Sequence, residues 1–100
     1  MAITKNDLIK EVAIYNAKYC KNTKHELTVL GAYGGYQVQL RGKKRKNGKG
    51  YRGYIGSGAV DITPGFSSPR VTLMNLFKRD SKGYVRDSIK HYEKKSRNNW

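Results

Sequence analysis

The residues best suited to chemistry in this sequence form a dense cationic run near its centre. Between Glu26 and Asp61 there is no acidic residue. The side chains of lysine and arginine neutralise phosphate groups and displace the counterions around them. The run therefore predicts a binding site for a polyanion, made by Arg41, Lys43, Lys44, Arg45, Lys46, Lys49 and Arg52.

Tyrosines on both sides of this run offer a second kind of contact. Tyr33 and Tyr36 precede it, and Tyr51 and Tyr54 follow it. Tyrosine rings stack on exposed bases, and a two-stranded ribbon can enter the major groove of DNA. We expect these tyrosines to lie at the base of a basic hairpin and to stack on bases or support the loop. The alternative is a solvated turn whose tyrosines face the core.

Base reading is a separate possibility for the polar positions of the same stretch. Gln37, Gln39, Arg41 and Arg52 would project together if one face of a sheet were polar, and glutamine and arginine can bind base edges. They fit ordinary solvent-facing strand positions equally well. We expect recognition of the backbone or of shape in preference to recognition of a base sequence.

Groups for catalysis or for metal binding are sparse. His25 and His91 are far apart and belong to no spacing that binds zinc. Asp61 could meet Asp80 or Asp87 in space, but nothing in the spacing requires it, and paired carboxylates are what acid–base catalysis needs. We therefore expect a protein that is not an enzyme, with no catalytic residue, no metal and no cofactor.

Composition limits the size and the partners of the fold. One hundred residues make one domain, 1–100, with a single modest core. The net charge of +14 suits nucleic acid, an acidic protein surface or anionic lipid. No run approaches the ~18 apolar residues of a membrane span, so we expect no membrane partner. The lone Cys20 and the charged start MAITKNDLIKEV indicate a cytoplasmic protein without a signal peptide.

The first half of the chain contains one helical pattern and two strand patterns. Thr4 and Asp7 form a capping box for a helix that starts near Lys5 and ends around residues 20–22, with apolar positions spaced by three and four. A strand is expected over 26–33, followed by a Gly34-Gly35 turn. Alternation of apolar and polar residues predicts a second strand over 36–41.

The middle of the chain predicts a hairpin that carries the cations. Asn47-Gly48 is typical of a hairpin turn within the loop 42–50. A return strand is expected over 51–55. The stretch GSGAVDIT mixes glycine with β-prone residues, so it fits a bulged segment or a short fourth strand.

Two helices are expected in the last third. Ser68 caps the first, Pro69 begins it, and it runs to about Arg79. Its spacing predicts that Val71, Met74 and Phe77 are buried, with Leu73 and Leu76 beside them. The second runs over 84–95, and the tail 96–100 is expected to be frayed. These helices add a second cationic surface, made by Arg70, Lys78, Arg79, Lys82, Arg86, Lys90, Lys94, Lys95 and Arg97.

These elements predict an α+β fold. An N-terminal helix precedes a three- to four-stranded antiparallel sheet with a basic hairpin, and two C-terminal helices follow. The apolar faces of the helices should pack on one side of the sheet, leaving the other side polar and cationic.

The order of the YGGY turn, the GSGAVDITPGF break and the SSPRVTLMNLF helix resembles that of short accessory proteins encoded by phages and mobile elements of Gram-positive bacteria. The likeness covers residues 32–77 and carries over no functional residue. It implies a phage or prophage accessory role in the bacterial host cell. That class includes small DNA-binding factors and inhibitors of host defence such as anti-CRISPR proteins.

Two functions follow as expectations. The first is non-enzymatic binding of DNA or RNA, in which the basic hairpin grips phosphates and Tyr36, Tyr51 and Tyr54 stack or support it. The second is inhibition of the anti-CRISPR type, by binding a Cas nuclease or its guide RNA.

Overall fold

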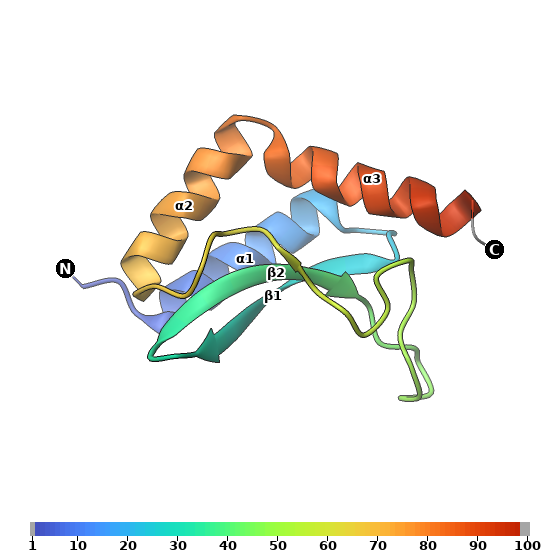
Figure 1. Cartoon of the computed structure of the whole chain (residues 1–100), viewed down its shortest axis with the longest axis horizontal. Helices are drawn as coiled ribbons and strands as arrows, with labels where there is room; N and C mark the ends of the chain where they lie inside the picture. The colour runs from blue at the N-terminus through green and yellow to red at the C-terminus, as the bar shows by residue number, and fades with distance from the viewer. Residues whose placement is uncertain (1, 99–100) are drawn as a thin grey trace.

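The computed structural model describes residues 2–98 and has the expected α+β architecture. A three-stranded antiparallel sheet, in the order β1-β2-β3, packs against three helices (Figure 1). The elements are α1 (Lys5–Tyr19), β1 (His25–Ala32), β2 (Gly35–Gly42), β3 (Val60–Asp61), α2 (Pro69–Ser81) and α3 (Tyr84–Asn98). None of the helices in residues 2–98 is long and apolar enough to cross a membrane.

Helix α1 begins at the predicted capping box, packs Leu8, Val12 and Tyr15 into the core and contacts β1. The Thr4 hydroxyl accepts from the Asp7 amide, and the Asp7 carboxylate accepts from the Thr4 amide. The Asn16 side chain of α1 forms two hydrogen bonds with the backbone of β1, as a neighbouring strand would. Its side-chain amide donates to the Leu27 carbonyl at 2.9 Å, and its side-chain oxygen accepts from the Leu27 amide at 2.7 Å. The amide and the carbonyl of Leu27, which face away from β2, are thereby satisfied.

Strands β1 and β2 form a regular hairpin whose inner face belongs to the core. Leu27 lies opposite Leu40 and Val29 opposite Val38, and Leu40 and Val38 are fully buried. Leu8, Ile62 and Leu76 join the same cluster. The period-two pattern seen in the sequence therefore corresponds to a strand with one face directed at the helices.

The predicted return strand over 51–55 is wrong. Residues 53–57 form turns, and only an isolated bridge joins Tyr51 to Lys44. Gly53 and Gly56 adopt φ angles of +84° and +59°, which interrupt an extended strand. The third strand is instead the two-residue β3, within the stretch that the sequence left open between a bulge and a short strand.

The predicted buried face of α2 is also wrong. Thr72, Leu73 and Leu76 are buried, whereas Val71, Met74 and Phe77 are 44–57% exposed. The helix carries two apolar stripes, and the one with Leu73 and Leu76 packs into the core. On the same face the Thr72 hydroxyl donates to the Tyr36 carbonyl at 2.9 Å, which also accepts from the Ser67 amide at 3.1 Å.

Helix α3 packs Val85 and Ile89 into the core, as predicted, but it extends past the predicted end at Lys95. Ser96, in the segment expected to be frayed, is fully buried within the helix. Residues 99–100 of that predicted tail lie outside the described residues.

Candidate nucleic-acid interface

Residues 43–52 leave the end of β2, project from the body of the protein and return beside it (Figure 1). We call this segment the basic finger. Three backbone hydrogen bonds hold its two sides together: Arg52 N–H donates to the Lys43 carbonyl at 2.7 Å, Arg45 N–H to Gly50 at 3.1 Å, and Gly48 N–H to Arg45 at 2.9 Å. The finger turns within the predicted loop, but the hydrogen-bonded turn is centred on Lys46 and Asn47, and of the predicted pair only Gly48 has a positive φ, +74°.

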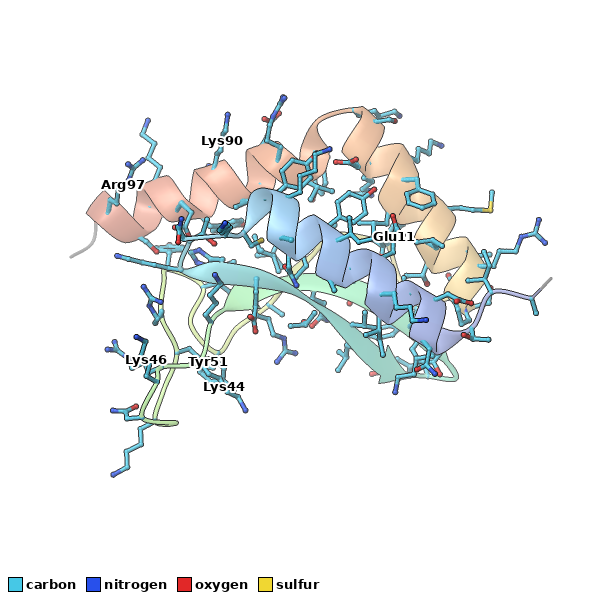
Figure 2. The ribbon with its side chains drawn as sticks, turned by 180° about the vertical axis from the view of Figure 1, so that it is seen from behind. Glu11, Lys44, Lys46, Tyr51, Lys90 and Arg97 are labelled. Atoms are coloured by element: carbon cyan, nitrogen blue, oxygen red, sulfur yellow. The ribbon has the colours of Figure 1, made fainter. Side chains whose placement is uncertain are left out.

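The side chains of Lys44, Arg45, Lys46, Lys49 and Arg52 are all exposed on the finger. Figure 2 shows Lys44 and Lys46 directed away from the body. Two ion pairs occur within residues 2–98, His25–Glu93 and Arg86–Asp87, and neither involves the finger. These five cations therefore meet solvent without a neutralising carboxylate in the described part of the chain.

Two of the seven predicted cations serve the fold instead. The Lys43 ammonium donates to the Cys20 carbonyl at the end of α1, at 2.7 Å. Arg41 is half-buried and donates twice to the side-chain oxygen of Gln39, at 3.2 and 3.0 Å. A lysine or arginine that satisfies a buried acceptor is not free to bind phosphate.

The predicted base-reading face of β2 is closed by its own hydrogen bonds. Gln39 donates to the Gln37 side chain at 2.7 Å, and Gln37 donates to the Thr63 carbonyl at 3.1 Å. Both glutamines are buried. This polar ladder, which ends at Arg41, stabilises the sheet, so the hypothesis that Gln37 and Gln39 read bases is wrong for this conformation.

The tyrosines are not gathered at the base of the finger as predicted. Tyr33 and Tyr36 lie at the opposite end of the β1–β2 hairpin, where Tyr36 pairs with Ser67. Tyr51 is half-buried and bridges to Lys44 across the finger. Tyr54 alone of the four is both exposed and next to the finger base, with 47% of its surface accessible.

Tyr54 is joined by two residues of α3 that the sequence did not connect with it. Its ring stacks on Tyr92 with centroids 6.1 Å apart and an interplanar angle of 25°. The Lys95 ammonium lies 5.1 Å above the same ring. In proteins that bind single-stranded nucleic acid, cations contact the phosphates and aromatic rings stack on the bases. No sequence signal links Tyr54 to α3, because only the folded chain brings these segments together.

A buried histidine fixes the base of the finger to α3. His25 is fully buried, its Nδ1 contacts the Glu93 carboxylate, and its Nε2 accepts from the Ile55 amide at 3.3 Å. Glu93 also accepts from the Lys24 amide at 3.0 Å. His25 and Glu93 hold the finger base, α3 and β1 together.

Cys20, the one cysteine in the sequence, is buried near the base of the finger. Burial raises the pKa of the Cys20 thiol to about 11, which keeps it protonated at neutral pH. Within residues 2–98, no group of three or more His, Cys, Asp or Glu side chains could hold a metal ion. The described residues that come together here offer cations and aromatic rings.

Comparisons with family models, curated proteins and solved structures yield no match for this chain.

Proposed function

We propose that this protein is a non-enzymatic nucleic-acid-binding protein that grips phosphates with the basic finger. The observation that supports it is a projecting, acid-free segment whose five exposed cations have no carboxylate partner among the described residues. Self-repulsion of such a cluster is relieved by a polyanion. In this role the protein acts in the cytoplasm of a bacterial host, as a phage-type accessory factor.

The finger presents its cations on a base that hydrogen bonds hold in place. Arg45 and Arg52 carry planar guanidinium groups that can bind phosphate oxygens in pairs, and the lysines act as mobile point charges. The hydrogen bond from Gly42 N–H to the Gly56 carbonyl, at 3.0 Å, and the bond from Ile55 to His25 hold the base of the finger. A fixed base lowers the entropy lost when the cations bind phosphate.

Salt dependence tests this proposal directly. Five phosphate contacts predict a log–log slope of affinity against salt of about −4.5 for duplex DNA and about −3.5 for a single strand. Fluorescence anisotropy of labelled oligonucleotides between low and physiological salt measures the slope. Affinity that does not change with salt contradicts phosphate binding.

A charge-matched pair of variants locates the contact. The triple variant Lys44→Ala, Lys46→Ala, Lys49→Ala should bind oligonucleotides at least about tenfold more weakly and lower the slope by about 2 to 3. The control variant Lys5→Ala, Lys10→Ala, Lys18→Ala removes the same charge from α1. Equal losses in the two variants would show that net charge alone, not the finger, determines binding.

A second candidate is an inhibitor of the anti-CRISPR type that binds a Cas nuclease or its guide RNA. The exposed side chains of Val71, Met74 and Phe77 on α2 favour it, because apolar groups of this size on a surface are typical of contacts with protein. Loss of target cleavage by a purified nuclease at equimolar protein supports this function. A Met74→Glu variant that keeps oligonucleotide binding but loses inhibition would separate it from the first.

A further inference from the structure

A groove of about 790 Å³ is lined by residues of α2, α3 and the segment 60–64, and Tyr92, whose ring stacks on Tyr54, is one of its lining residues. We call it the α2–α3 groove. Its volume falls within the range of sites that hold organic ligands. The groups that bear on ligand chemistry are two cations from α2, the cation of its C-cap residue and three aromatic rings from α3, namely Lys78, Arg79, Lys82, Tyr84, His91 and Tyr92.

The groove is cationic and has rings in fixed positions. Its one carboxylate, Asp87, is already paired with Arg86 at 3.2 Å. The Arg79 guanidinium lies 4.7 Å above the Tyr84 ring, and the Tyr84 hydroxyl contacts the Asp61 carbonyl at 3.4 Å. The guanidinium covers one face of the Tyr84 ring, so a base can stack only on the other face while a phosphate meets the cations of the groove.

Tyr92 connects this groove with the basic finger. One part of Tyr92 lines the groove, and its ring stacks on Tyr54, above which the Lys95 ammonium lies. Tyr54 follows Gly53, and Gly53 lines a hollow with Lys24, Arg45 and Arg52. Arg45 and Arg52 in turn line the next hollow out along the finger. Cations and rings thus extend from the groove to Tyr54, and cations continue from there onto the finger, whose base lies below the C-terminal half of α3 in Figure 1.

We propose that this continuous surface is a track for single-stranded nucleic acid, with phosphates on its cations and bases on Tyr84, Tyr92 and Tyr54. The proposal rests on the proposed function and narrows its ligand. A duplex keeps its bases stacked on one another, so it can use the projecting finger but not rings that line a groove. A single strand presents free base faces and bends to follow a concave path.

The test compares a single strand with a duplex in fluorescence anisotropy at constant salt. The probes are a labelled oligothymidylate of about 20 nucleotides, longer than the roughly 4–16 that small single-strand binders cover, and a duplex of equal length. The wild type should bind the single strand at least about tenfold more tightly. The groove variant Lys78→Ala, Lys82→Ala should lose that preference and keep its affinity for the duplex.

Matched controls show whether the effects are specific to the track. One removes the same charge elsewhere, and another replaces a tyrosine elsewhere. Lys10→Ala, Lys18→Ala removes the same charge from α1 and should leave the preference unchanged. Tyr54→Leu keeps apolar bulk but removes the ring, and should weaken single-strand binding at least about fivefold. Tyr33→Leu, at the opposite end of the sheet where Tyr33 is 92% exposed, should have no effect.

The outcomes for the track and for the finger can be told apart. A duplex bound as tightly as the single strand, or a groove variant with wild-type affinity for both, overturns the track even if the finger triple variant still weakens binding. Failure of the wild type to bind either probe at low salt, or unchanged binding by the finger triple variant, overturns the proposed function and the track with it. Thermal unfolding of each variant confirms that the changes reach binding and not folding.

Discussion

The chain reverses direction in two hairpin-like segments that differ in what holds them together. The β1–β2 hairpin pairs His25–Ala32 with Gly35–Gly42 in continuous register, and one face is built into the core. The basic finger has a single bridge between its sides and no buried residue between Lys43 and Arg52. In the first hairpin, the side chains pack in the core or form the polar ladder of Gln37, Gln39 and Arg41. In the second, most side chains are exposed to solvent.

The same difference appears in how each segment uses its cations. Arg41, inside β2, completes a row of hydrogen bonds from Gln37 and Gln39, and Lys43, at the start of the finger, satisfies the last turn of α1. From Lys44 onward, the charged groups of the finger have no carboxylate partner within residues 2–98. The cations that stabilise the fold therefore end at Lys43, and the exposed cations without a carboxylate partner begin at Lys44.

The largest expected effect is on the packed hairpin. Leu40→Ala removes a fully buried side chain from the inner face of β2. Leucine-to-alanine changes in a core cost about 2–5 kcal/mol, a large part of the ~5–15 kcal/mol that stabilises a domain. Urea unfolding measures the loss. Ile14→Ala removes a branched aliphatic side chain from a surface site on α1 and should cost little. Similar losses in both variants would contradict a core centred on β2.

A smaller effect is expected at the base of the finger. A methyl group added at Gly53 would lie 2.5 Å from Nε2 of buried His25, and the residue has a φ of +84°. Gly48, at the tip, has a φ of +74° with open space around it. Gly48→Ala should cost about 1 kcal/mol for the backbone alone, and Gly53→Ala should cost at least about 1 kcal/mol more because His25 must move.

Unfolding experiments on the two glycine variants test whether the contacts of His25 with Glu93 and Ile55 hold the base of the finger in place. Equal destabilisation by Gly53→Ala and Gly48→Ala would mean that the His25 ring yields freely and does not fix the finger base. A further loss of oligonucleotide affinity in Gly53→Ala alone would connect the position of the base with binding.

Local signals in the sequence predicted the elements that depend on neighbouring residues. The Thr4–Asp7 box, Ser68 before Pro69, and the alternation in β2 each describe a few consecutive positions, and each is confirmed. Asn47-Gly48 likewise predicted a turn within the finger. Such signals act through backbone conformation and nearby hydrogen bonds, which the sequence alone largely determines.

Contacts between distant segments were not predictable in the same way. Lys43 and Cys20, His25 and Glu93, and Tyr54 and Tyr92 lie far apart in the chain. Their pairing decides which cations are free, what fixes the finger base and where an aromatic platform forms. On α2 two apolar stripes are present, and contacts with distant segments decide which is buried: Leu73 and Leu76 pack in the core, and Thr72 bonds to the Tyr36 carbonyl.

A still smaller change in stability is expected from the finger cations. Replacing Lys44, Lys46 and Lys49 by alanine removes exposed groups that make no ion pair with the described residues. Stability should change by less than about 0.5 kcal/mol, and relief of self-repulsion favours a slight gain. Thermal unfolding at low salt is the measurement. A loss above about 1 kcal/mol would mean that these lysines stabilise the fold, contrary to their exposure.

The smallest effect is expected at the tight turn of the β1–β2 hairpin. Tyr33 and Gly34 both adopt positive φ angles, +51° and +70°, in a two-residue loop for which Asn-Gly is the preferred pair. Tyr33→Asn should gain a few tenths of a kcal/mol from the backbone, since asparagine tolerates this region better than tyrosine. Part of that gain is offset by losing the contact between the Tyr33 and Phe66 rings, whose centroids are 5.3 Å apart.

The control variant Tyr33→Ala loses the ring without improving the backbone preference. The difference in unfolding free energy between the two variants therefore measures the contribution of the turn conformation. If Tyr33→Asn is no more stable than Tyr33→Ala, turn geometry contributes nothing, and packing along β1 and β2 alone distinguishes this hairpin from the finger.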